Sequence, residues 1–220
     1  MSSCKVTLPL VSASLFLGLE STKKWGGVRR QDRGCHAYLG ARLIDGVGLD
    51  QMGLPTPCSD WDVRALLTHL VGGNLRYADL ARGEPMRQGP ARGGNPATDL
   101  LGDDPASAYR RSAASVDAVW RDPALLDQMC DLPIGTLPGR AALTLHLVET
   151  ITHGWDLAKA TGQRPVFDPD VVRAATQFVR PDAPGARPPS AAFAAPVPVA
   201  DDLPELDRLA ASLGRTPSTP

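Results

Sequence analysis

The sequence predicts an all-α fold. Apolar residues recur at the spacing of a helix face in several segments, most of these segments are bordered by residues that start or stop helices, and only one short stretch resembles paired strands. With 220 residues, the chain is long enough for one domain with a core of its own. Its 21 glycines and 21 prolines favour a helical body with irregular N-terminal and C-terminal extensions.

The N-terminal segment, residues 1–34, is predicted to be a disordered extension of a domain that covers residues 35–217. Its first 21 residues carry one lysine followed by an apolar stretch, which weakly resembles a secretory signal. That stretch is too short to cross a bilayer, and a polar, glycine-rich segment follows it. The first helix is predicted within residues 36–47, where apolar residues recur at helical spacing before a glycine-rich break.

The second helix is predicted over about residues 60–82. Ser59 precedes it and Asp62 follows three residues later, which approximates a capping box at the helix start. Residues 83–104 are rich in glycine, proline and charged side chains and show no sustained periodicity. We expect them to form a loop.

The third helix is predicted to begin at Asp104 and to stop at Pro123, because a proline cannot continue a helix. Residues 129–139 then suggest a short extended or hairpin element. The fourth helix has the strongest pattern and covers about residues 138–161. Gly162 follows it and is suited to the left-handed conformation that often ends a helix.

A fifth helix is predicted over residues 168–179. Proline and alanine dominate residues 181–200, so no regular element is expected there. Near the C-terminus, Leu206, Leu209 and Leu213 are spaced so that a short helix could dock them on the domain.

The charge balance points to small-molecule partners. A formal net charge of −1 and a pI near 6.4 give no excess of positive charge for nucleic acid or for an anionic membrane surface, so neither is expected as a partner. The four cysteines form no C-x-x-C pair, which favours reduced thiols and a cytoplasmic location. The sequence leaves a homodimer open.

Three of the four histidines lie in the two strongest predicted helices. Glu149 and His153 are four residues apart, so they share a helix face and can bind one ion. His69 is the natural third ligand because it lies on the stripe of its helix that should face the core. His146 precedes His153 by seven residues on nearly the same face and is an alternative or fourth ligand.

Two histidines and a carboxylate, with a coordination position left open, are typical of a catalytic zinc site. Zn²⁺ is the expected ion, and Ni²⁺, Fe²⁺ or Co²⁺ suits the same ligand set. The pattern H-x-x-E-x-x-x-H differs from the zinc-protease motifs. A competing interpretation makes these histidines ordinary hydrogen-bonded residues of a helical bundle.

Three segments carry a family resemblance: residues 55–74 with W-D-V-R-x-L-x-x-H, residues 146–163 with H-G-W-D-L-A-x-A-T-G, and residues 196–217. In this order they resemble the actinobacterial metal-binding family related to the N-terminal domain of mycothiol-dependent maleylpyruvate isomerase, within the DinB-like superfamily. The resemblance covers roughly residues 36–217.

The resemblance implies a DinB-like four-helix bundle with a metal site at one end of its core. The family's ligands fall on His69, Glu149 and His153, the same residues that helix spacing selects. It further implies mycothiol as a cofactor. The isomerase itself has a second domain that contributes to its active site, so the resemblance does not imply maleylpyruvate isomerisation for this chain.

Residues beside the proposed ligands have two interpretations each. Asp156 could orient a ligand histidine or pair with Lys159 on the same helix. Trp61 and Trp155 are expected to be core residues rather than walls of a pocket, because large aromatic side chains are usually buried in cores. Cys58 has no nearby histidine in the sequence, so we expect a structural or incidental thiol.

Two functions follow from this site. The first is a metal-dependent transferase or isomerase that uses a low-molecular-weight thiol on a small electrophilic substrate, with the metal favouring the thiolate. No general acid or base is identifiable for it in the sequence. The alternative is a non-catalytic metal-binding sensor or interaction module built on the same bundle.

Overall fold

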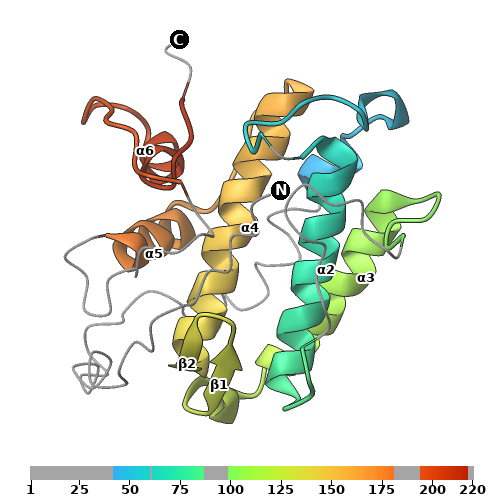
Figure 1. Ribbon diagram of the computed structural model, residues 1–220, viewed down its shortest axis with the longest axis vertical. Helices are drawn as coiled ribbons and strands as arrows, with labels where there is room; N and C mark the ends of the chain where they lie inside the picture. Colours follow the sequence, from blue (N-terminus) through green and yellow to red (C-terminus); the bar gives the residue numbers. More distant parts are fainter. Residues whose placement is uncertain (1–41, 60, 87–98, 181–193, 218–220) are drawn as a thin grey trace, which may run out of the picture.

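The computed structural model describes residues 42–59, 61–86, 99–180 and 194–217. Within them it confirms the all-α, DinB-like fold: long helices lie side by side, and the strands form only a small two-stranded sheet (Figure 1). The predicted extension over residues 1–34 lies outside the described residues, as do parts of the segments 36–47, 83–104 and 181–200. The domain boundaries therefore stay a prediction.

Three long helices form the body of the bundle. Helix α2 (Val63–Ala81) packs against both α3 (Pro105–Trp120) and α4 (Gly139–Thr161). Apolar side chains of α2 are buried on both sides of the helix, because it lies between two neighbours. This arrangement places the face of α2 that carries His69 opposite α4 (Figure 1).

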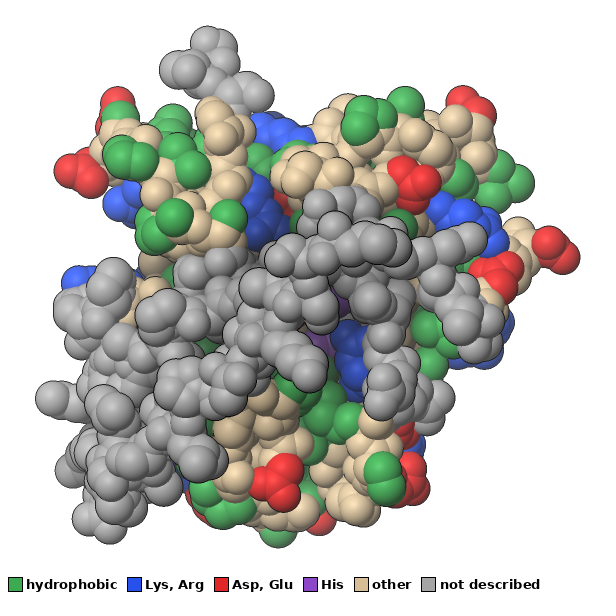
Figure 2. Space-filling view, in the orientation of Figure 1, with side chains coloured by type: hydrophobic (Ala, Val, Ile, Leu, Met, Phe, Trp, Pro, Cys, Tyr) green, Lys and Arg blue, Asp and Glu red, His purple; other side chains and the backbone are tan. Residues whose placement is uncertain are grey.

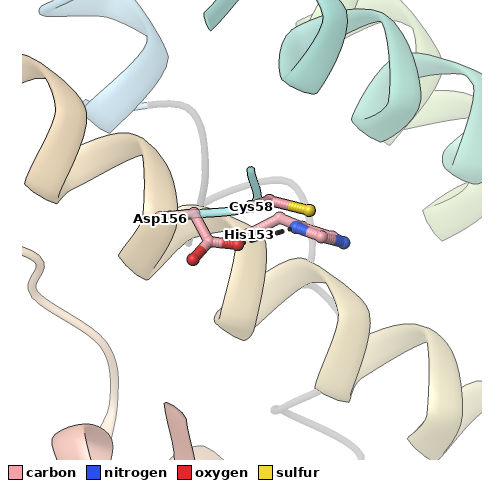
Figure 3. A group of neighbouring side chains, drawn as sticks. All are labelled: Cys58, His153 and Asp156. Carbon is pink, nitrogen blue, oxygen red and sulfur yellow. Dashed lines mark hydrogen bonds and ion pairs between the residues drawn. The ribbon is translucent and has the colours of Figure 1, made fainter. Parts of the chain in front are cut away.

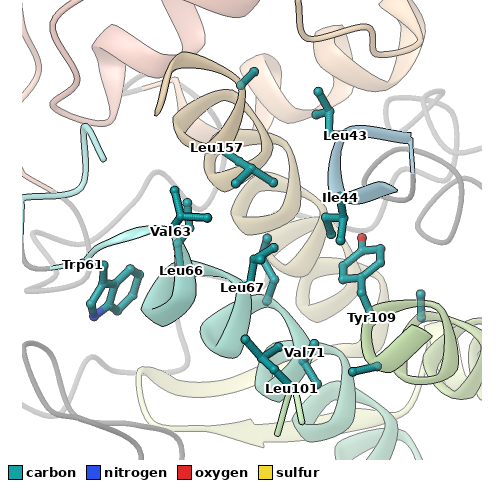
Figure 4. Close-up of a cluster of buried hydrophobic side chains, with 14 residues drawn as sticks. Leu43, Ile44, Trp61, Val63, Leu66, Leu67, Val71, Leu101, Tyr109 and Leu157 are labelled. Carbon is teal, nitrogen blue, oxygen red and sulfur yellow. The ribbon is translucent and has the colours of Figure 1, made fainter. Parts of the chain in front are cut away.

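Residues 42–45 are helical and provide the described end of the first predicted helix. Leu43 and Ile44 are buried there against apolar side chains of α2, α3 and α4 (Figure 4). The 3-10 helix η4 (Leu49–Gln51) follows. This cluster closes the end of the bundle that lies near the C-terminus of α4.

The start of α2 differs from the prediction. The helix begins at Val63, and its N-cap is Asp62, whose Oδ1 accepts a hydrogen bond from the Ala65 N–H at 2.8 Å. The capping box at Ser59 is therefore wrong. Asp62 is held in extended backbone by an antiparallel bridge to Pro55, so the helix cannot begin earlier.

The third helix and the hairpin agree with the prediction. The carboxylate of Asp104 caps α3 by accepting from the Ser107 N–H at 2.9 Å. After the 3-10 helix η5 (Pro123–Leu126), strands β1 (Met129–Leu132) and β2 (Gly135–Pro138) pair antiparallel. The hairpin leads directly into α4 and packs against its first turns.

Helix α4 is buried along most of its length. Gly162 ends it in the left-handed conformation, with φ of 69°, as predicted. Helices α5 (Pro169–Val179) and α6 (Glu205–Ser212) cover the side of α4 that faces away from α2, and the Trp155 indole N–H donates to Asp207 Oδ1 at 2.7 Å. None of the described helices is long and apolar enough to span a membrane.

Candidate metal centre

Three side chains from α2 and α4 meet where the two helices face each other. His69 comes from α2, and Glu149 and His153 come from α4, one turn apart. The Glu149 Oε2 atom lies 3.2 Å from His69 Nε2 and 3.6 Å from His153 Nε2. The fold therefore brings together all three predicted ligand residues, although His69 and Glu149 are 80 residues apart in the sequence.

The spacing of these atoms fits a divalent metal ion. One ligand atom from each residue lies within 4.8 Å of the others. In a tetrahedral site with bonds of about 2.0–2.1 Å, neighbouring ligand atoms are about 3.3 Å apart. The two separations from Glu149 Oε2, 3.2 Å and 3.6 Å, are close to that value. An ion would need only small side-chain adjustments to bind all three.

The protonation states of Glu149 and His69 also suit a cation. Burial alone would raise the pKa of Glu149, but hydrogen bonds to His153 and His69 hold it well below its usual value of 4.5. Burial lowers the pKa of His69, and the hydrogen bond to Glu149 offsets only part of that shift. At neutral pH the site therefore offers a carboxylate and a neutral imidazole, the forms that bind metals.

The orientation of His153 is set from its other side. Asp156 Oδ2 lies 3.0 Å from His153 Nδ1, and Arg215 holds the same carboxylate through two bonds, Nη2 to Oδ2 at 2.8 Å and Nε to Oδ1 at 3.2 Å. Asp156 thus orients the imidazole, while Lys159, its other predicted partner, lies over an indole ring. Because the Nδ1 side is engaged, His153 Nε2 is directed at the triad.

Burial would lower the pKa of His153, but the hydrogen bonds to Asp156 and Glu149 outweigh it and raise the pKa above its usual value. In the metal-free protein His153 therefore holds a proton more readily than His69 does. A metal ion must displace that proton from Nε2, so metal affinity should fall as the pH falls.

Trp61 forms one wall of the triad. Its ring centroid lies 4.4 Å from that of His69 and 5.4 Å from that of His153. Trp61 is buried, as predicted, but its ring also lies against both imidazoles, so it is a core residue and a wall of the site at once. Trp155, in contrast, points to α6 and is a core residue with one hydrogen bond.

His146 belongs to a separate cluster. Its Nε2 lies 3.0 Å from Asn74 Oδ1, and its ring stacks on Tyr77 with centroids 4.3 Å apart. The Asn74 amide donates in turn to Ser112 Oγ at 3.0 Å. Among the described residues, the groups spaced to hold a metal do not include His146. Its role as an alternative or fourth ligand is therefore not supported by the geometry.

Cys58 lies beside the site, although no histidine is near it in the sequence. The Cys58 Sγ atom, a ring nitrogen of His153 and a carboxylate oxygen of Asp156 all lie within 4.8 Å of one another (Figure 3). No local pattern in the sequence indicates this neighbour, because the histidine that approaches Cys58 comes from α4, far away in the sequence. Asp156 is already bonded to Arg215, so the triad remains the better candidate for a metal.

The triad is open on one side. The side chain of Glu149 is 24% exposed and that of His69 is 16% exposed, whereas His153 is only 5% exposed. On the face drawn in Figure 2, histidine side chains are visible next to a Lys or Arg side chain near the middle of the molecule. Glu149 and His69 therefore have exposed surface at the triad, whereas His153 is almost fully enclosed.

The fold and the site define a class: DinB-like helical bundles with a candidate metal site between two core helices. The chain matches the mycothiol maleylpyruvate isomerase N-terminal domain over residues 37–158, a range that includes all three triad residues. The chain belongs to this family.

Two relatives, from two strains of Mycobacterium tuberculosis, are each 36% identical over 180 residues, which are 80% of this chain and 91% of the relative. Both are described only as uncharacterized proteins. Two crystal structures of the mycothiol-dependent maleylpyruvate isomerase, one of them a mutant, match with TM-scores of 0.54 and 0.53 and 18% identity, over 69% of each chain. At this identity the structures show a shared fold.

Proposed function

We propose that His69, Glu149 and His153 bind one divalent metal ion, with Zn²⁺ the expected ion. We further propose that the loaded protein is a transferase or isomerase that uses a mycothiol-type thiol on a small electrophilic substrate. The observation that carries this proposal is the convergence of three ligand atoms within 4.8 Å at a partly exposed site. Membership in the family of the mycothiol maleylpyruvate isomerase N-terminal domain supports the thiol.

A bound divalent ion would supply the charge that favours a thiolate, the nucleophilic form of a thiol, at neutral pH. The chain's own residues do the rest. Glu149 contributes the one negative charge of the ligand set, and the Asp156 carboxylate keeps the His153 ring in place. Trp61 covers one side of both imidazoles, so ligands enter from the side of Glu149.

Metal analysis tests the first part of the proposal. Wild-type protein, dialysed without chelator and supplied with Zn²⁺, should hold about one equivalent, because three ligands from folded helices form one site. His69→Ala and His153→Ala should each lose it. Absence of stoichiometric metal in the wild type, with Ni²⁺ and Co²⁺ as well, would reject both the enzyme and the metal-sensor interpretations.

Thiol consumption tests the second part. The metal-loaded wild type is incubated with mycothiol and small electrophiles, such as activated alkenes, and the loss of free thiol is followed against the chelated protein. Metal-dependent consumption supports the enzyme. Stoichiometric metal without thiol binding or turnover would instead favour the non-catalytic metal-binding module.

A further inference from the structure

Helix α2 carries an arginine two turns after its metal-ligand candidate. Arg76 follows His69 by seven residues, so the two lie within about 20° of each other around the helix. A Cβ added at Gly72 would lie 3.4 Å from Arg76 Nη1, and one added at Gly73 would lie 3.9 Å from Nη2 and 3.8 Å from His146 Cε1. The guanidinium therefore folds back over the two glycines, about 5 Å, or one helical turn, from His69 along the axis.

The guanidinium of Arg76 is half-buried, yet it lacks a partner within the part of the chain that the structure describes. No described oxygen accepts a hydrogen bond from it, and no described carboxylate forms an ion pair with it. Arg215, the other arginine beside the site, makes two bonds to Asp156. A guanidinium has five N–H donors, and burying them unpaired is costly. Among the described residues, no side chain competes with a ligand for the donors of Arg76.

The net charge around the metal-loaded triad would be positive, which favours binding of an anion. Burial lowers the pKa of Arg76, and the field of Glu149 is the largest influence that opposes this shift. Glu149 is a metal ligand in the proposed function. A divalent ion, Glu149 and Arg76 would together carry two positive charges, while Asp156 and Arg215 neutralise each other on the far side of His153. A thiolate compensates one of the two charges, and a second anionic group is needed for the other.

We propose that Arg76, lying over Gly72 and Gly73, is a carboxylate-binding subsite beside the metal site. The site would then select molecules that carry a carboxylate near the atom held at the triad. The planar fork of a guanidinium matches a carboxylate through two parallel hydrogen bonds. This inference rests on the proposed function, because it takes the metal at the triad as the other anchor of the ligand.

The carboxylate could belong to the thiol or to the electrophilic substrate, and two binding experiments on the full chain loaded with Co²⁺ distinguish these sources. In the first, the visible spectrum of Co²⁺ is titrated with 3-mercaptopropionate and with the uncharged 3-mercapto-1-propanol. In the second, the protein is saturated with the uncharged thiol and titrated calorimetrically with butyrate.

The variants are Arg76→Gln, which removes the charge, and Arg76→Lys, which keeps the charge without the fork. Arg64→Gln is the matched control, because Arg64 lies on the same helix, is 46% exposed and pairs with Asp99. Cobalt content and circular dichroism are measured for each protein. They show whether a variant has lost its metal or its fold.

In Arg76→Gln we expect the affinity for the carboxylate ligand to fall about tenfold or more, the range for a charge-assisted hydrogen bond. Arg76→Lys should lose less, and binding of the uncharged thiol should not change. An effect in the first experiment assigns the carboxylate to the thiol, and an effect in the second assigns it to the substrate.

Carboxylate binding that is absent in both experiments, or that does not depend on Arg76 while cobalt is retained, would overturn the subsite and leave the proposed metal function intact. Wild-type protein that binds no cobalt would overturn both. If Arg64→Gln lost as much carboxylate affinity as Arg76→Gln, the effect would come from net charge alone and the subsite would be rejected.

Discussion

Two polar clusters lie between α2 and α4, and they differ in how their hydrogen bonds are completed. In the triad, His69 and His153 both turn Nε2 toward one carboxylate oxygen of Glu149, which is 24% exposed. In the second cluster, His146 is 3% exposed, pairs with Asn74 and stacks on an aromatic ring. The same two helices thus hold His146, whose hydrogen-bonding partner is a protein amide, and a pair of histidines, His69 and His153, that both face the partly exposed carboxylate of Glu149.

The difference shows what separates a structural histidine from a candidate ligand. Spacing along α4 places His146 and His153 on nearly the same face. The distinction comes from the facing residue of α2, which is an amide at Asn74 and a second imidazole at His69. An amide satisfies an imidazole, whereas two imidazoles around one carboxylate leave room for a cation.

The largest loss of stability is expected from a substitution of Asp156, which contacts a histidine of the triad and none of the cluster around His146. Asp156→Ala leaves Arg215 buried without its counter-charge and should lower the free energy of unfolding by about 3–5 kcal/mol. Urea denaturation of the metal-free protein measures it. Asp170→Ala, which removes an exposed partner of Arg173, is the control and should cost below about 1 kcal/mol. Similar losses at both positions would argue against a supporting role for the buried pair.

The stabilisation of the fold by added metal should depend on the triad and not on the cluster around His146. Zn²⁺ at about 100 times its dissociation constant should raise the free energy of unfolding by about 2.7 kcal/mol, because the ion binds only the folded state. His146→Ala should show the same increase, and His69→Ala should show none. Thermal denaturation with and without Zn²⁺ measures this. Stabilisation that survives in His69→Ala would place the ion elsewhere.

The cluster around His146 and Asn74 should contribute to the stability of the fold and not to metal binding. His146→Ala leaves the Asn74 carbonyl oxygen without its imidazole partner and should lower the free energy of unfolding by about 1–3 kcal/mol. Its metal content should equal that of the wild type. Metal loss in a folded His146→Ala protein would show that the two clusters act as one site.

The triad and its supporting carboxylate should contribute to the acid sensitivity of the fold, as should the helix-capping Asp104 and the exposed Asp99, whose pKa values are also lowered. The pKa values of Glu149 and Asp156 lie below their usual values of 4.5 and 3.8, so the stability that they contribute is fully present above these values. It is lost as the pH falls through the lower folded values. The free energy of unfolding of the metal-free protein should therefore decline below about pH 4.5, the usual value for Glu149.

Two variants check the origin of this decline. It should be less steep in Asp156→Asn, which has one titrating group fewer. In Asn74→Ala, which removes no titrating group, it should be unchanged. Equal slopes in Asp156→Asn and the wild type would exclude Asp156 as a source of the acid sensitivity.

Local sequence signals predicted much of the fold and part of the site. The glycine after α4 and the aspartate before α3 mark helix ends, because caps depend on residues within one turn. The start of α2 was misplaced because a backbone bridge from Pro55 to Asp62 delays the helix, and such a bridge has no periodic signature. Arg76 could have been noticed, since it repeats the face of His69 after two turns.

By itself, the sequence determined that Glu149 and His153 share one face of α4, because helical spacing is a property of neighbouring residues. The core-facing stripe of its helix and the family resemblance both selected His69 as the third ligand. Only the tertiary structure decided that Arg215 fixes Asp156 and that Cys58 approaches His153. It also decided that His146 is engaged by Asn74. These contacts join residues distant in the chain, and their geometry depends on how whole helices pack, which no local pattern of residues records.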